Sequence, residues 1–88
     1  MGFFSKKQKV NYDELFKEQY KSINQLAMQA HNELDYVIKE SLYAVIVKKY
    51  DELLDMIDQG ANYDKQHFQS LKESAMKEYE ILQKMNKD

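Results

Sequence analysis

The chain of 88 residues contains no cysteine, proline, tryptophan or arginine, and it contains only two glycines. Without cysteine it forms neither a disulfide nor a thiolate, which fits a reducing compartment. Glycine occurs only at positions 2 and 60, so little in the sequence interrupts a helix. Without arginine the protein lacks the planar group that reads guanine and clamps phosphates. These absences favour a helical protein and disfavour specific recognition of nucleic acid.

The net charge of −2 is unevenly distributed along the chain. Residues 1–10 carry three lysines and no acid, so the remaining 78 residues carry a net charge of −5. An acidic body disfavours nonspecific binding to nucleic acid. The longest apolar run, residues 42–47, has six residues, far fewer than the ~20 that a membrane span needs. We therefore expect one small cytoplasmic domain.

The first and last helices have clear sequence boundaries. Asn11, followed three residues later by Glu14, is a variant of the capping box and begins a helix over about 11–31. Gly60 ends a helix, and either Asn62 or Asp64 caps the next one, over about 63–86. Each of the two helices carries one narrow apolar stripe. The stripes are Leu15, Phe16, Tyr20, Ile23, Leu26, Ala27 and Ala30, and Phe68, Leu71, Ala75, Tyr79, Leu82 and Met85.

Two readings of the segment between these helices remain open. Asn32 can cap a new helix over about 33–59, with Glu33 and Asp35 in its first turn. That break gives three helices of similar length and predicts an all-α, three-helix bundle. The alternative is one uninterrupted helix of ~73 Å with a C-terminal hairpin return, in a dimer. In both readings residues 11–88 form a single helical domain, and residues 1–10 are a flexible basic lead.

The apolar residues between 42 and 57 occupy an arc of roughly 200° on a helix, wider than the ~100° that a surface helix needs. This pattern predicts the central helix, with the other two packed against it. We expect four of its residues to be almost fully buried: Leu42, Ile46, Leu53 and Ile57.

A tyrosine stripe lies at one edge of this arc. Tyr36, Tyr43 and Tyr50 follow one another at intervals of seven residues, and Val47 and Leu54 share their edge. Tyrosine is favoured at interfaces because its ring is apolar and its hydroxyl tolerates water. We predict an interface here with a protein partner or with a second copy in a homodimer. The alternative is that these are boundary residues of a monomeric bundle.

Residues suited to catalysis or to metal binding do not form a recognisable motif. His31 and His67 each lack a second ligand at the spacing of a zinc site. We therefore predict no enzymatic activity, no metal and no cofactor. An acidic run of Asp51, Glu52, Asp55 and Asp58 is either a solvated face or a docking patch for a basic partner.

The sequence thus predicts a small non-catalytic protein of bacterial, phage or plasmid origin that regulates or assists another protein by binding it. One alternative is a peripheral protein at the inner face of the membrane, held by Phe3 and Phe4 with the basic side chains of Lys6, Lys7 and Lys9. Another is a purely structural homo-oligomer.

Overall fold

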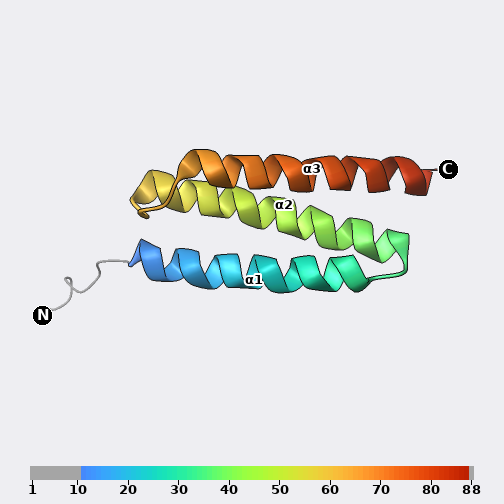
Figure 1. Ribbon diagram of the computed structural model, residues 1–88, viewed down its shortest axis with the longest axis horizontal. Helices are drawn as coiled ribbons and strands as arrows, with labels where there is room; N and C mark the ends of the chain where they lie inside the picture. The colour runs from blue at the N-terminus through green and yellow to red at the C-terminus, as the bar shows by residue number, and fades with distance from the viewer. Residues whose placement is uncertain (1–10, 88) are drawn as a thin grey trace, which may run out of the picture.

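The computed structural model describes residues 11–87. It shows three helices, each antiparallel to the one before it: α1 (Tyr12–Asn32), α2 (Tyr36–Gln59) and α3 (Lys65–Lys87) (Figure 1). Residues 11–87 contain no strand. The prediction of an all-α, three-helix bundle is confirmed. The alternative of one continuous helix through residues 11–59 is wrong, because residues 33–35 are not helical and both Glu33 and Asp35 have extended backbones.

Local capping explains where α1 begins and where α2 begins. The backbone N–H of Glu14 donates to the Asn11 side chain at 3.2 Å, as the capping box predicts. The predicted cap of α2 is wrong, since Asn32 is the last residue of α1 and Asp35 takes the role instead. Asp35 Oδ1 accepts from the backbone N–H groups of Val37 at 2.9 Å and Ile38 at 3.3 Å. Its negative charge also suits the positive end of the helix dipole.

The turn between α2 and α3 combines a glycine stop with an aspartate start. Gly60 has φ +127°, a conformation that costs least without a Cβ. The Gly60 N–H donates to Ile57 O at 3.1 Å, and the Ala61 N–H donates to Met56 O at 2.9 Å. This pair of bonds is a Schellman motif. Of the two predicted caps of α3, Asp64 is the one used, accepting from the backbone N–H of Gln66 at 3.1 Å.

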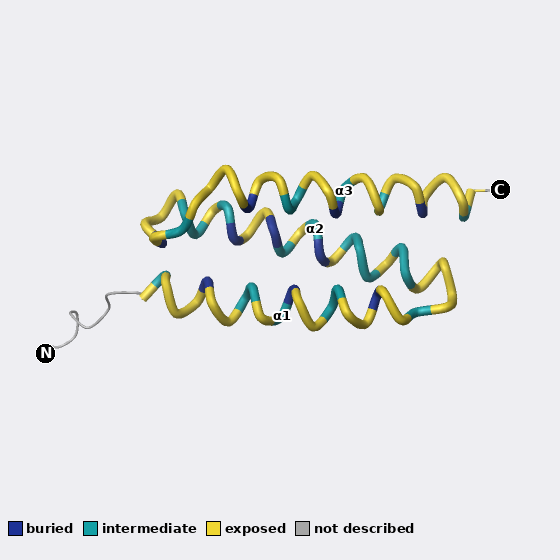
Figure 2. The backbone as a smooth tube through the Cα atoms, viewed as in Figure 1, coloured by how far each residue is buried: buried dark blue, intermediate teal, exposed yellow. Residues whose placement is uncertain are grey.

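Helix α2 lies between its two neighbours, as its wide apolar arc predicts (Figure 1). It packs against both α1 and α3, whereas the α1 and α3 backbones do not approach within 8 Å, measured between Cα atoms, anywhere in the described chain. Figure 2 shows that buried residues recur along one side of each outer helix. These buried residues are seven apart: Phe16, Ile23 and Ala30 on α1, and Phe68, Ala75 and Leu82 on α3.

Near the start of α1, an aromatic cluster joins α1, the α2–α3 turn and α3. The Phe16 ring stacks on Tyr63 in the α2–α3 turn, with centroids 3.9 Å apart. It also meets Phe68 of α3 edge to face at 4.8 Å. Tyr20 contacts the same Phe68 ring at 5.2 Å. These rings provide the direct side-chain contact between the two outer helices, and Asn62 N–H adds a 2.8 Å hydrogen bond to Asp13.

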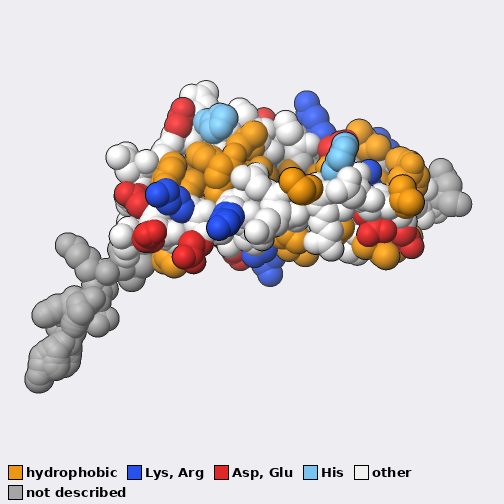
Figure 3. Space-filling model, turned by 60° about the horizontal axis from the view of Figure 1, so that its bottom comes forward, with side chains coloured by type: hydrophobic (Ala, Val, Ile, Leu, Met, Phe, Trp, Pro, Cys, Tyr) orange, Lys and Arg blue, Asp and Glu red, His pale blue; other side chains and the backbone are white. Residues whose placement is uncertain are grey.

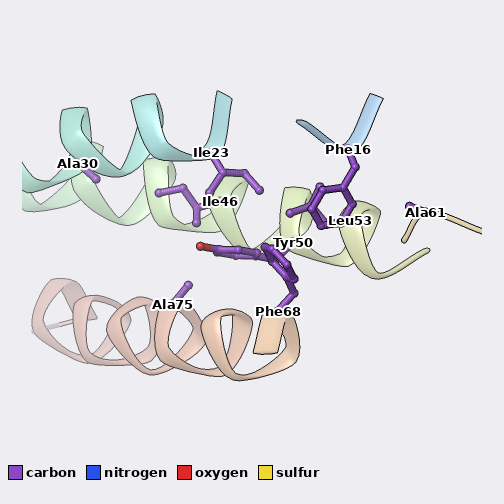
Figure 4. Close-up of a cluster of buried hydrophobic side chains, with 9 residues drawn as sticks. All are labelled: Phe16, Ile23, Ala30, Ile46, Tyr50, Leu53, Ala61, Phe68 and Ala75. Atoms are coloured by element: carbon purple, nitrogen blue, oxygen red, sulfur yellow. The ribbon is translucent and has the colours of Figure 1, made fainter. Parts of the chain in front are cut away.

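The core of α2 differs in part from the prediction. Ile46 and Leu53 are 2% and 0% exposed, as expected. Leu42 and Ile57 are only partly buried. Leu42 lies closer to the start of α2, and Ile57 closer to its end, than any of the buried residues of the helix, which occupy its middle. Tyr50, which was not among the four predicted core residues, is buried instead. Figure 4 shows it among side chains from all three helices that point into the space between them.

Candidate protein-binding surface

The predicted tyrosine stripe is divided between the core and the surface. Tyr36 is exposed, Tyr43 is half-buried and Tyr50 is buried in the core. Val47 and Leu54 are half-buried and pack against the core. Helix α3 covers much of this edge of α2, which is why Tyr50 is not accessible to a partner. The first two tyrosines remain at the surface.

Those two tyrosines line a shallow pocket of about 160 Å³ between α2 and α3, which we call the α2/α3 pocket. Helix α2 contributes three residues at positions i, i+3 and i+7, and α3 contributes the other wall. The lining residues are Tyr36, Lys39 and Tyr43 from α2, and Glu78, Ile81, Leu82 and Met85 from α3. Because helical residues three and seven apart share a face, each helix presents one continuous stripe to the pocket.

The pocket holds one charge of each sign. Lys39 Nζ lies 5.9 Å from the centre of the Tyr36 ring, a cation–π contact. Neither Lys39 nor Glu78 forms an ion pair with another residue of the 11–87 segment. Burial raises the pKa of Tyr43, and the charge of nearby Glu78 raises it further. Tyrosine is already a neutral phenol at neutral pH, and these surroundings extend that neutral form to a higher pH for Tyr43.

Exposed apolar side chains concentrate at the end of the bundle where this pocket lies, next to the α1–α2 loop. We call this region the open end. Nine large hydrophobic residues are exposed in the described chain, and six of them lie within residues 34–38 or 81–85. The six are Leu34, Tyr36, Val37, Ile38, Ile81 and Met85. Asn86 holds these two segments together, because its side-chain amide donates to Tyr36 O at 2.8 Å and to Glu40 at 2.9 Å.

Sequence reasoning found only Tyr36 of these six as an interface residue. It assigned Met85 to the core stripe of the last helix, but Met85 is 47% exposed. Leu34 is 92% exposed in the α1–α2 loop, whereas the sequence analysis places it in the first turn of a helix over about 33–59. Ile81 lies off the predicted stripe of α3 and is exposed for that reason. Figure 3 shows hydrophobic side chains gathered towards both ends of one face, with more polar surface between them.

The acidic run near the end of α2 is largely occupied by contacts within the chain. Asp58 pairs with Lys65 at 2.7 Å, and Asp51 pairs with Lys72. Glu52 accepts a hydrogen bond from the Gln19 side chain. These contacts connect the run to α1 and α3, and Asp55 takes part in none of the three. The run therefore presents less free negative charge to a basic partner than its sequence suggests.

A larger depression, of about 540 Å³, lies on the other side of the α2–α3 pair. Charged and amide side chains line it: Glu40, Glu80, Gln83, Lys84, Asn86 and Lys87. It lacks the apolar anchors that carry binding energy in protein interfaces. The smaller α2/α3 pocket has those anchors, so we treat it as the candidate site in spite of its size.

The other residues considered in the sequence analysis are the two histidines and the basic lead. His31 and His67 are both exposed, and no group of three metal-binding side chains occurs among the described residues. No helix within residues 11–87 combines the length and the apolar character needed to cross a membrane. Phe3, Phe4, Lys6, Lys7 and Lys9 lie outside the described residues.

Comparison with known proteins gives no relative from which a function could be transferred. No protein-family model matches the chain, and no curated protein or solved structure matches it either. The functional argument for this three-helix protein therefore depends on its own surface.

Proposed function

We propose that this protein acts by binding another protein through its open end. The observation that carries the proposal is the concentration there of six of the nine exposed large hydrophobic residues in the described chain. Scattered exposed apolar residues are normal, whereas a concentration of them in one region of the surface is typical of an interaction site. Three of the six, Tyr36, Ile81 and Met85, line the same α2/α3 pocket. The composition also fits, because tyrosine and methionine are enriched in protein interfaces and lysine and glutamate lie at their rims.

The bundle is suited to presenting this surface rather than to changing shape. Asp35 and Asn86 fix the start of α2 and its contact with α3 through four hydrogen bonds. A surface held on packed helices loses less conformational entropy on binding than one on a flexible loop. We infer that the open end is a largely preformed binding surface of a small regulatory or accessory protein.

The experiment compares two kinds of apolar-to-acid substitution. Val37→Glu combined with Ile81→Glu changes the open end, and Met28→Glu makes the same chemical change at an exposed residue of α1. Tagged native and variant proteins are used to capture binding proteins from an extract of the source cells. We expect the double variant to lose the captured proteins that the native chain and Met28→Glu retain.

Circular dichroism supplies the folding control, since all three changed side chains are exposed and the helical signal should persist. Capture of the same proteins by the native chain and the folded double variant would show that the open end is not the binding surface.

A further inference from the structure

We infer that the α2/α3 pocket binds a second copy of this chain, so that the protein is a two-fold symmetric dimer. This inference depends on the proposed function and names the partner at the open end. Its basis is the arrangement of charge within the pocket. The α2 stripe of Tyr36, Lys39 and Tyr43 is apolar with one positive charge. The α3 stripe, with Glu78, Ile81 and Met85, is apolar with one negative charge.

A two-fold interface brings the same patch of both copies together, so a contact from one residue to another occurs twice. If the axis runs along the helices, α2 of one copy faces α3 of the other. Lys39 then lies beside Glu78 of the second copy, and the tyrosines of α2 face the apolar residues of α3. If α2 instead faces α2, the two Lys39 charges approach each other. Like charges at an interface are unfavourable, so the charges select the first arrangement.

The state of these residues in the single chain agrees with this arrangement. Neither Lys39 nor Glu78 has an ion-pair partner among the described residues, so both charges are available to a second copy. Tyr36, Ile81 and Met85 are about half exposed, and a second copy would cover them. Since α2 and α3 are antiparallel, the two pairs would form an antiparallel four-helix arrangement, a common solution for burying apolar stripes.

The test uses charge reversal at the two predicted contact residues. Lys39→Glu and Glu78→Lys each place like charges across the interface. Each variant alone should therefore dimerise at least about tenfold more weakly than the native chain, because two contacts per dimer are reversed. An equimolar mixture of the two variants should form a heterodimer in which both contacts join opposite charges. The double variant, Lys39→Glu with Glu78→Lys, should dimerise like the native chain for the same reason.

Sedimentation equilibrium over a range of protein concentrations measures each dissociation constant. The matched control is Lys48→Glu, which makes the same charge change at an exposed residue nine positions along α2. Nine residues correspond to a rotation of about 180°, so Lys48 lies on the opposite side of the helix from Lys39. The control should dimerise like the native chain, and circular dichroism should show the same helical content in every variant.

Three outcomes would overturn this inference. The first is a native protein that remains monomeric at every concentration. The second is a native dimer that the single charge reversals do not weaken. The third is a mixture of the two single variants that stays monomeric although both are folded. If any of these occurs while Val37→Glu with Ile81→Glu still abolishes capture of another protein, the open end binds a different partner and only the second-copy inference fails.

Discussion

Phe16→Ala tests how the bundle is held together. The Phe16 side chain is 0% exposed and contacts Tyr63 and Phe68, which belong to the turn and to α3. Truncating a buried phenylalanine costs about 3–5 kcal/mol of unfolding free energy. A chain of this length has a total of roughly 4–13 kcal/mol. The variant should therefore be close to unfolding, with a thermal midpoint lowered by roughly 12–40 °C.

The assay is thermal and urea denaturation followed by circular dichroism. Met28→Ala, at an exposed residue of the same helix, is the control and should change the free energy by no more than about 0.5 kcal/mol. A double-mutant cycle with Phe68→Ala should give a coupling energy of about 0.5–1.5 kcal/mol, because the two rings are in edge-to-face contact. A loss below about 1 kcal/mol for Phe16→Ala, or strict additivity in the cycle, would refute the reasoning.

Two further predictions concern a helix cap and a buried phenol. Asp35→Ala should lower the free energy of unfolding in urea by about 0.5–2 kcal/mol, because the cap of α2 is removed. Asn32→Ala should lower it by no more than about 0.5 kcal/mol. A larger loss for Asn32→Ala than for Asp35→Ala would contradict the assignment of the cap. Burial raises the pKa of Tyr50 above its ordinary value of 10.0. The contribution of its neutral phenol to the free energy of unfolding is therefore fully present below pH 10.0 and is lost as the pH rises through the raised pKa. The urea midpoint should fall less steeply above pH 10.0 in Tyr50→Phe than in the native chain, and equal slopes would exclude Tyr50 as a source of the fall.

Features of the fold that depend only on residues close by in the sequence could be predicted from the sequence. Asn11, Gly60 and Asp64 act on backbone groups within a few residues, so their roles follow from local chemistry. The cap of α2 was misplaced because Asn32 and Asp35 are both good capping residues. Which of them is used depends on where the last turn of α1 ends, and that turn contains the fully buried Ala30 and extends to Asn32.

The sequence could not show which residues of the tyrosine stripe are buried and which are exposed. A wide apolar arc shows that α2 has two neighbours, but it does not show on which side of the arc each of them lies. In the structure α3 covers the tyrosine edge, as the Asp51–Lys72 pair shows, and Tyr50 becomes part of the core. The open end could not be predicted for a similar reason, because Leu34 in the α1–α2 loop and Ile81 in α3 are far apart in the sequence and come to the same end of the bundle only in the folded structure.

The packing of each helix against its neighbour in sequence has a consequence for folding kinetics. Nearly all contacts between elements join α1 to α2 or α2 to α3, so they link helices that follow one another in the sequence. Helical proteins of low contact order fold in roughly microseconds to milliseconds. The contact of Phe16 with Phe68 joins residues 52 positions apart, as the residue numbers show. This contact joins the first helix to the third and needs both helical hairpins in place, so we expect the two hairpins to form first and the aromatic rings to come together last.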